Sequence, residues 1–179
     1  MPTERDRDEK LAELLLLLAE GLEGVRAAGA TKLNKLAFFA EFAHVRATGR
    51  AITGVEYQRL PNGPAPRRLV PVRQMLVDRG AAELREEPYL GRMQHRLVPR
   101  RRADRSLFSP SELAAVDEVL AAFAAHTGTS LSELSHEEPA WDLVDEGETI
   151  PFEAAFLRRG RPGAKALQRA RELAQQYTA

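Results

Sequence analysis

The chain has 179 residues and a mass of 19.9 kDa, and 44% of its residues are hydrophobic and 29% charged. This length and apolar content are typical of one folded domain and exclude a wholly disordered chain. The absence of cysteine excludes disulfides, thiolate metal clusters and cysteine nucleophiles. The longest apolar run, residues 14–19, is far shorter than the ~20 residues that cross a bilayer. We therefore expect a cytoplasmic domain without a membrane partner.

Charge is segregated along the chain although the net charge is zero. Residues 31–105 carry a net charge of +9, whereas residues 106–157 contain no Lys or Arg and carry −11. The two blocks either attract each other within the fold or present faces of opposite potential to partners. The arginines of the first block could follow a phosphate backbone, but the third predicted helix lacks a polar face that would read bases.

The first predicted helix spans about residues 8–27, where leucines recur at three- and four-residue spacing. Leu16 and Leu17 point away from that stripe, so we expect this helix to contact neighbours on two sides, among them the C-terminal helix, or else a second chain. A second helix is predicted over residues 32–48, with Thr31 as its N-cap.

The middle of the chain predicts turns, a helix and a hairpin. Residues 49–66 are rich in Gly and Pro, which favours a structured loop with a short strand and a tight turn at Asn62–Gly63. A third helix is predicted to about residue 79, with Pro71 at its start or at a kink. Residues 83–99 predict a β-hairpin that turns within 88–91. Three helices followed by a hairpin is the element order of a winged helix.

The last third contains the strongest local signal. Ser109–Glu112 is a capping box with proline at the first helical position, which predicts a helix to about residue 126. A second capping box over residues 130–133 and a proline before Trp141 predict two short helices. Residues 150–152 fit either a strand or a helix entry, and a final helix is predicted over about 164–177. The expected fold is mostly α with a small β element (α+β), a compact multi-helix domain with a winged-helix-like hairpin.

The sequence lacks the usual catalytic motifs. It has no nucleotide-binding loop, nucleophile elbow or zinc-protease motif. The four histidines are far apart, and adjacent carboxylates such as Glu137–Glu138 diverge rather than form a general acid/base pair. We therefore expect no enzyme activity, no metal, no cofactor and no small-molecule substrate.

Four ordered segments resemble one known family. They are TKLNKL (Thr31–Leu36) with the aromatic pair Phe38–Phe39, TGRAITGVEY and LPNGPAP within 48–66, LSELSH over 131–136 followed by Trp141, and GETIPF over 147–152. Together they resemble the Panacea, or SocA-like, antitoxin domain. The resemblance implies a mostly helical domain of a toxin–antitoxin pair that neutralises its toxin by direct protein contact.

The resemblance suggests a division of the chain and a set of framework residues. Residues 1–30 are expected to be an N-terminal helical extension, 31–157 the Panacea-like domain, and 158–179 a basic helix packed on that domain. The motif positions expected to be mainly structural are Lys32, Asn34, Lys35, Phe38, Phe39, Gly54, Gly63, Pro64 and Trp141. Gly54 and Gly63 suit backbone with positive φ. Lys32 and Lys35, at the start of a helix, are expected to need acidic neighbours from the −11 block.

The partner surface is expected in the loop over 57–68 and near the end of LSELSH. The candidate partner-binding residues are Tyr57, Arg59, Asn62, Arg67, Arg68 and His136. Because Arg67 and Arg68 are expected to be exposed, their replacement by Glu should hardly change the melting temperature. The expected partner is a cognate toxin, with a homodimer and operator DNA as further candidates. A winged-helix DNA-binding regulator and a proteolysis adaptor for the toxin are the alternative functions.

Overall fold

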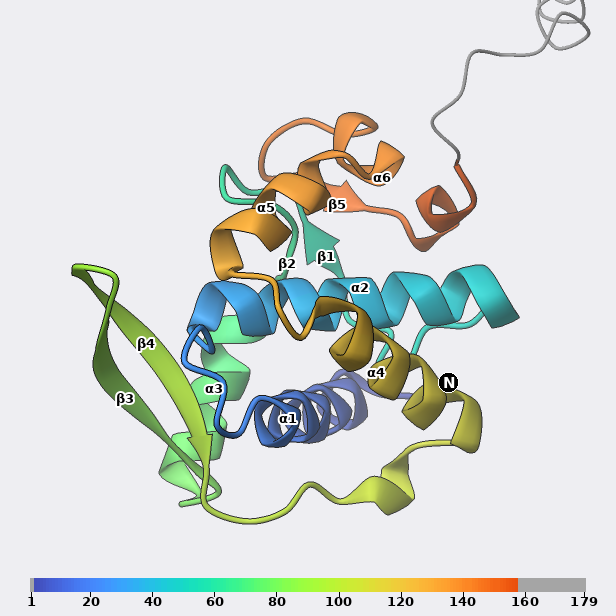
Figure 1. Cartoon of the computed structure of the whole chain (residues 1–179). Coiled ribbons are helices and arrows are strands. Elements are labelled where there is room, and N and C mark those ends of the chain that lie inside the picture. The colour runs from blue at the N-terminus through green and yellow to red at the C-terminus, as the bar shows by residue number, and fades with distance from the viewer. Residues whose placement is uncertain (1, 158–179) are drawn as a thin grey trace, which may run out of the picture.

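The computed structural model describes residues 2–157 (Figure 1). Its helices are α1 (Glu4–Gly21), α2 (Ala30–Thr48), α3 (Leu69–Asp78), α4 (Pro110–Phe123), α5 (Gly128–His136) and α6 (Pro139–Asp142). Its strands are β1 (Tyr57–Gln58), β2 (Ala65–Pro66), β3 (Ala82–Tyr89), β4 (Arg92–Pro99) and β5 (Thr149–Ile150), and two 3₁₀ turns span Arg105–Leu107 and Phe152–Phe156. The mostly α fold with a small β element is confirmed. The helix predicted over 164–177 lies outside the described residues.

Helix α1 lies at the centre of the domain. Every residue from Leu11 to Ala19 is buried, and α2, α3, α4 and β4 all contact this helix. Leu16 and Leu17 are only 0% and 3% exposed. The expectation that this helix contacts neighbours on more than one side is confirmed, whereas the alternative that Leu16 and Leu17 face a second chain or the C-terminal helix is wrong, because elements within residues 2–157 already cover them.

Helix α2 separates two layers of the molecule (Figure 1). Helices α1 and α4 pack on one side, and α5 with the three-stranded sheet lies on the other. The helix begins at Ala30 after the N-cap residue Gly29, so the predicted cap at Thr31 is wrong, and no side chain caps this end. Phe38 and Phe42 extend from α2 into the core, where their ring centroids lie 4.3 Å apart.

The small sheet joins the two halves of the motif region. Its strand order is β2-β1-β5, all antiparallel, with Tyr57 opposite both Pro66 and Ile150. The tight turn at Asn62–Gly63 is confirmed, since the Gly63 N–H donates to the Leu60 carbonyl at 2.8 Å and Gly63 has a φ of +96°. The two structures predicted for residues 150–152, a strand and a helix entry, both occur: β5 ends at Ile150 and a 3₁₀ turn begins at Phe152.

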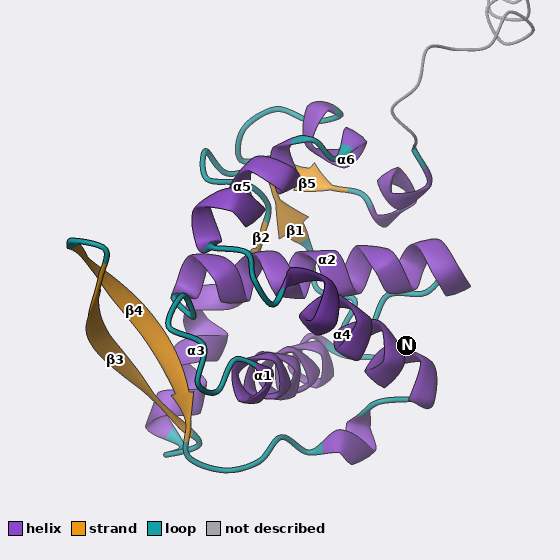
Figure 2. Cartoon of the chain, in the orientation of Figure 1, coloured by secondary structure: helices purple, strands orange, loops and turns teal. Residues whose placement is uncertain are grey.

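The predicted hairpin is confirmed and projects from the body of the domain (Figure 2). Strands β3 and β4 pair from Ala82–Pro99 up to Tyr89–Arg92, so the turn is Leu90–Gly91 and is shorter than the predicted one. Pro88 lies within the strand. In a two-residue hairpin its position is one whose N–H would point away from the partner strand, which is why a proline fits there.

The helix caps are partly as predicted. Ser109 caps α4, and the Glu112 carboxylate accepts from the Ser109 N–H at 2.8 Å, which confirms the capping box. The predicted cap over residues 130–133 is wrong, because the capping box of α5 is formed by Thr127 and Ser130. The threonine preceding Gly128 offers a hydroxyl one turn earlier, so the helix begins at Gly128.

Candidate functional site

The two motif lysines are buried and bind backbone carbonyls. Lys35 Nζ donates to the Pro64 carbonyl at 2.9 Å. Lys32 Nζ donates to the carbonyls of Ala124 and His126 at 3.0 and 2.7 Å, at the C-terminal end of α4. The predicted carboxylate partners are therefore wrong; a helix end presents carbonyls that attract a cation equally well. Burial lowers the pKa of both amines, that of Lys35 to about 8.

Gly63 allows the turn to pack directly on α5. A Cβ at this position would lie 2.6 Å from Lys35 Nζ and would overlap the Ser135 hydroxyl. Ser132 Oγ donates to the Asn62 carbonyl at 2.6 Å from the same helix. The turn is thus fixed on α5 with no room for a side chain at Gly63. Gly54 also has the predicted positive φ, +71°.

Arg59 and His136 surround Trp141. The Arg59 guanidinium lies 4.6 Å from the Trp141 ring centroid and donates to the carbonyls of Trp141 and Val144 at 3.1 and 2.7 Å. The His136 ring lies 4.3 Å from that of Trp141, and burial, together with the charges of Lys35 and Arg59, lowers the pKa of His136. Both candidate partner-binding residues therefore also hold α6 in place.

Tyr57 belongs to the core. Its side chain is 0% exposed and its ring packs on those of Phe38, Phe42 and Phe152. Burial raises the pKa of the Tyr57 hydroxyl well above its usual value. The assignment of Tyr57 to the partner surface is therefore corrected. The motif residues Phe38, Phe39 and Trp141 are buried, as predicted.

Arg67 and Arg68 hold segments of the domain together. Arg67 donates to Thr149 Oγ1 at 3.0 Å, to Gln58 Oε1 at 3.1 Å and to the Gly147 carbonyl at 2.6 Å. Arg68 binds both carboxylate oxygens of Asp8 in α1, at 3.1 and 2.5 Å. Because of these contacts, replacing either arginine is expected to lower the stability of the domain rather than leave it unchanged. Asn62, by contrast, is exposed at the tip of its turn.

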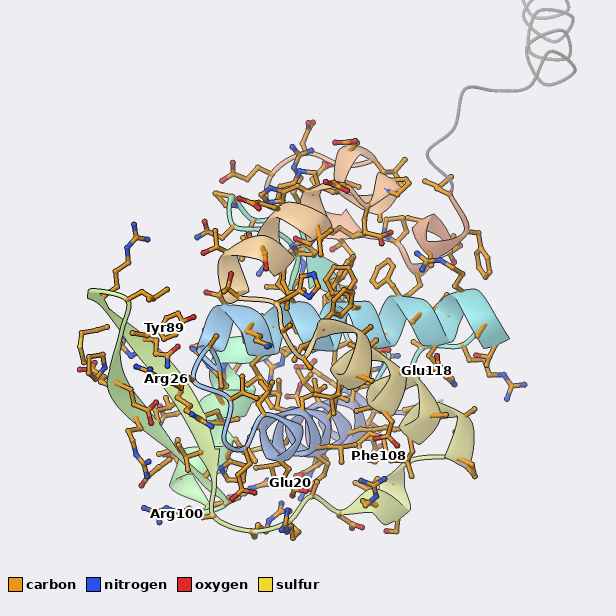
Figure 3. The ribbon with its side chains drawn as sticks, viewed as in Figure 1. Glu20, Arg26, Tyr89, Arg100, Phe108 and Glu118 are labelled. Carbon is orange, nitrogen blue, oxygen red and sulfur yellow. The ribbon has the colours of Figure 1, made fainter. Side chains whose placement is uncertain are left out.

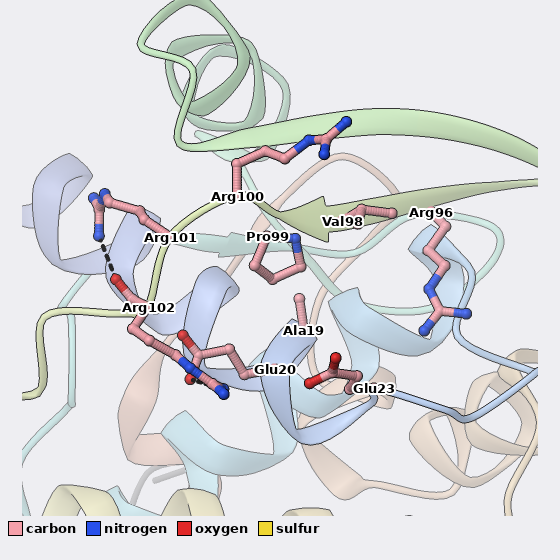
Figure 4. Close-up of a pocket in the computed structure, with 9 residues that line it drawn as sticks. All are labelled: Ala19, Glu20, Glu23, Arg96, Val98, Pro99, Arg100, Arg101 and Arg102. Atoms are coloured by element: carbon pink, nitrogen blue, oxygen red, sulfur yellow. Dashed lines mark hydrogen bonds and ion pairs between the residues drawn. The ribbon is translucent and has the colours of Figure 1, made fainter.

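The acids of α1 neutralise much of the +9 block. The ion pairs are Arg68–Asp8, Arg79–Glu9, Arg101–Glu13 and Arg102–Glu20. Arg101 and Arg102 line a cavity of about 330 Å³ at the base of the hairpin (Figure 4). In the same cavity Arg96 donates to the carbonyls of Leu22 and Val25. These internal contacts reduce the cationic surface that the DNA-binding alternative requires.

The −11 block presents a largely uncompensated surface. We call residues 128–157, from α5 to the last 3₁₀ turn, the acidic lobe. Six of its carboxylates are exposed and form no ion pair within residues 2–157: Glu133, Glu137, Asp145, Glu146, Glu148 and Glu153. The side chain of Leu143 is 52% exposed on the same lobe. Leu143 was not among the partner-binding residues predicted from the sequence. Its position between acidic residues after Trp141 is the only feature of the sequence that could have indicated its exposure.

Neither a metal centre nor a membrane span is found in the described part of the chain. Among residues 2–157, no three His, Asp or Glu side chains are placed to share a metal ion. No helix in that range combines the length and apolarity that a bilayer crossing needs.

The comparison with protein families identifies the framework. The family model described as "Antitoxin SocA-like, Panacea domain" matches residues 33–142. No curated protein and no solved structure gives a significant match. The match covers more than half of the chain. It includes Lys35 of α2 and Gly63, which meet at the Asn62–Gly63 turn, and Trp141 of α6, on which Arg59 packs. The chain therefore belongs to the SocA-like antitoxin family and contains its Panacea domain.

Proposed function

We propose that this chain neutralises a toxin protein by binding it directly, without catalysis. The family supports a toxin–antitoxin role. The observation that carries the mode of action is the acidic lobe, which contains both the exposed Leu143 and exposed carboxylates without ion pairs among the described residues. A protein interface needs an apolar anchor, and charge at its rim accelerates encounter and selects the partner.

The proposed contact surface combines the acidic lobe with the neighbouring turn at Asn62. Ser132 of α5 binds the backbone of this turn, so the turn and the lobe form one continuous surface. Arg59 and Arg67 stabilise this surface because they donate hydrogen bonds to residues 141–149. Because the exposed charges are negative, the toxin surface that docks here is expected to be basic.

The test is co-expression with the protein encoded by the neighbouring open reading frame. We expect wild-type protein to restore growth and to co-purify with that toxin. The double variant Glu137→Lys/Glu146→Lys should weaken the complex by roughly tenfold or more, since two attractive contacts become repulsive. The matched control is Glu118→Lys, which makes the same change at an exposed position of α4, outside the lobe (Figure 3). No growth rescue and no co-purification would refute the proposal.

The proteolysis-adaptor alternative makes a different prediction in the same experiment. Direct neutralisation leaves the amount of toxin unchanged and inhibits it in a stable complex. An adaptor lowers the toxin's half-life in a manner that depends on this protein. Measurement of toxin decay after translation is stopped, with and without this protein, separates the two modes.

A further inference from the structure

The hairpin tip departs from the usual chemistry of its turn. Leu90 and Gly91 have φ values of +47° and +74°, the conformation of a type I′ turn, which favours Asn, Asp or Gly at both positions. Leu90 is the one residue other than glycine with positive φ in residues 2–157, and its side chain is 81% exposed. A leucine here strains the backbone and leaves apolar surface in water. Departures of this kind, which do not help the isolated domain, occur at functional sites.

A groove of about 530 Å³ lies beside this tip. One wall is the end of the hairpin, where Leu90 and Met93, the latter 57% exposed, provide apolar surface. The other wall is formed by the beginnings of α2 and α5, including Ala30 and Gly128. Tyr89, labelled in Figure 3, marks the position of the groove near the tip. We call this feature the hairpin groove.

The hairpin groove is electropositive. None of its lining residues is Asp or Glu. Helix α2 begins there with no side-chain cap and no acidic residue in its first turn, and the first turn of α5 also lacks an acidic residue. The positive ends of both helix dipoles are therefore uncompensated by carboxylates in these turns. Arg92 lines the groove and forms no ion pair within residues 2–157.

We propose that the hairpin groove is a second docking site for the toxin and takes up a segment that carries a large apolar side chain next to carboxylates. The apolar side chain packs on Leu90 and Met93, and the carboxylates face Arg92 and the beginning of α2. This inference rests on the proposed function. Helix α5 connects the two sites, since it begins at the hairpin groove and ends in the acidic lobe. One toxin surface with a basic and an acidic region would fit both.

The test is the variant Leu90→Asn, measured for stability and for binding of the toxin from the neighbouring open reading frame. Asparagine adopts the backbone conformation of Leu90 more readily, so the melting temperature should rise by about 2–4 °C. The dissociation constant of the complex should increase at least tenfold because the apolar anchor is lost. The matched control Val70→Asn alters a side chain that is 66% exposed on α3, outside the groove, and should leave binding unchanged.

A charge variant provides a second measurement. Arg92→Glu should weaken the complex at least tenfold, and Arg105→Glu, at an exposed position outside the groove, should not. Wild-type affinity in both Leu90→Asn and Arg92→Glu would overturn the docking site while leaving the proposed function intact. Failure of the wild-type protein to bind the toxin would refute the proposed function and this inference with it. If Leu90→Asn converts a dimer of the free protein into a monomer by light scattering, the occupant is a second copy, and the assignment to the toxin is wrong.

Discussion

Replacement of Gly63 by Ala is expected to destabilise the domain by about 3 kcal/mol. Its φ of +96° costs any residue with a side chain about 1 kcal/mol. The new Cβ would lie 2.6 Å from Lys35 Nζ and overlap the Ser135 hydroxyl. Both groups are buried, so Lys35 has to give up its bond to the Pro64 carbonyl, a charge-assisted bond of about 2 kcal/mol. For a chain of this size the sum lowers the melting temperature by about 10 °C.

The assay is urea unfolding followed by circular dichroism, with Gly147→Ala as the control. Gly147 has a similar φ of +83°, but no atom lies within 4 Å of the Cβ that alanine would add. The control therefore measures backbone strain alone and should lose about 1 kcal/mol. Equal losses in the two variants would refute the argument that Gly63 is required for close packing on Lys35 and Ser135.

Three further variants test other contacts. Arg68→Glu places two carboxylates side by side at Asp8 and should lower the urea midpoint, whereas Arg92→Glu, at a position with no ion pair in residues 2–157, should not. Lys35 has a pKa of about 8 in the fold against 10.5 when exposed, so the unfolded chain binds more protons between these values. Stability should therefore rise from pH 8 to 10.5 and fall as the pH drops through 8, a slope that Lys35→Met should reduce in urea titrations at pH 7.5 and 9.5. Ser109→Ala removes the cap of α4 and should cost about 1 kcal/mol by calorimetry; an unchanged melting temperature would contradict this.

Local patterns predicted those elements whose signals lie in adjacent residues. The Ser109 cap, the hairpin and the Asn62–Gly63 turn each depend on a few neighbouring side chains, and all three are confirmed. The predicted beginning of α2 was two residues late and that of α5 three residues late, because several nearby residues can cap a helix and tertiary contacts choose among them.

The environment of buried polar side chains could not be predicted in the same way. Lys35 and Lys32 bind carbonyls 29 to 94 residues away, and nothing in the first turn of α2 distinguishes a distant carbonyl from a carboxylate. Glu41 likewise accepts from the backbone N–H groups of Ile52 and Thr53, at 2.5 and 2.9 Å, and burial raises the pKa of Glu41. In the sequence, the burial of Glu41 is indicated only by its position as a single carboxylate among the aromatic residues of α2.

The misassigned surface residues have a common cause. Tyr57 has both an apolar ring and a hydroxyl, so its type fits a core and an interface equally well, and only the three-dimensional packing on Phe38 and Phe42 decides. Arg67 and Arg68 are partly exposed, as predicted, yet their donors are occupied by groups from β1, β5 and α1. Residue type predicts exposure better than it predicts whether a side chain is available to a partner.

The central position of α1 has a consequence for synthesis of the protein. The segments that cover its leucines, α2, α3, β4 and α4, all follow it in the chain, and the last of them ends at Phe123. On the ribosome the leucine-rich helix is therefore made well before its covering and stays exposed to chaperones and proteases until α4 has emerged. Slow or interrupted translation should reduce the yield of folded protein even when the finished domain is stable.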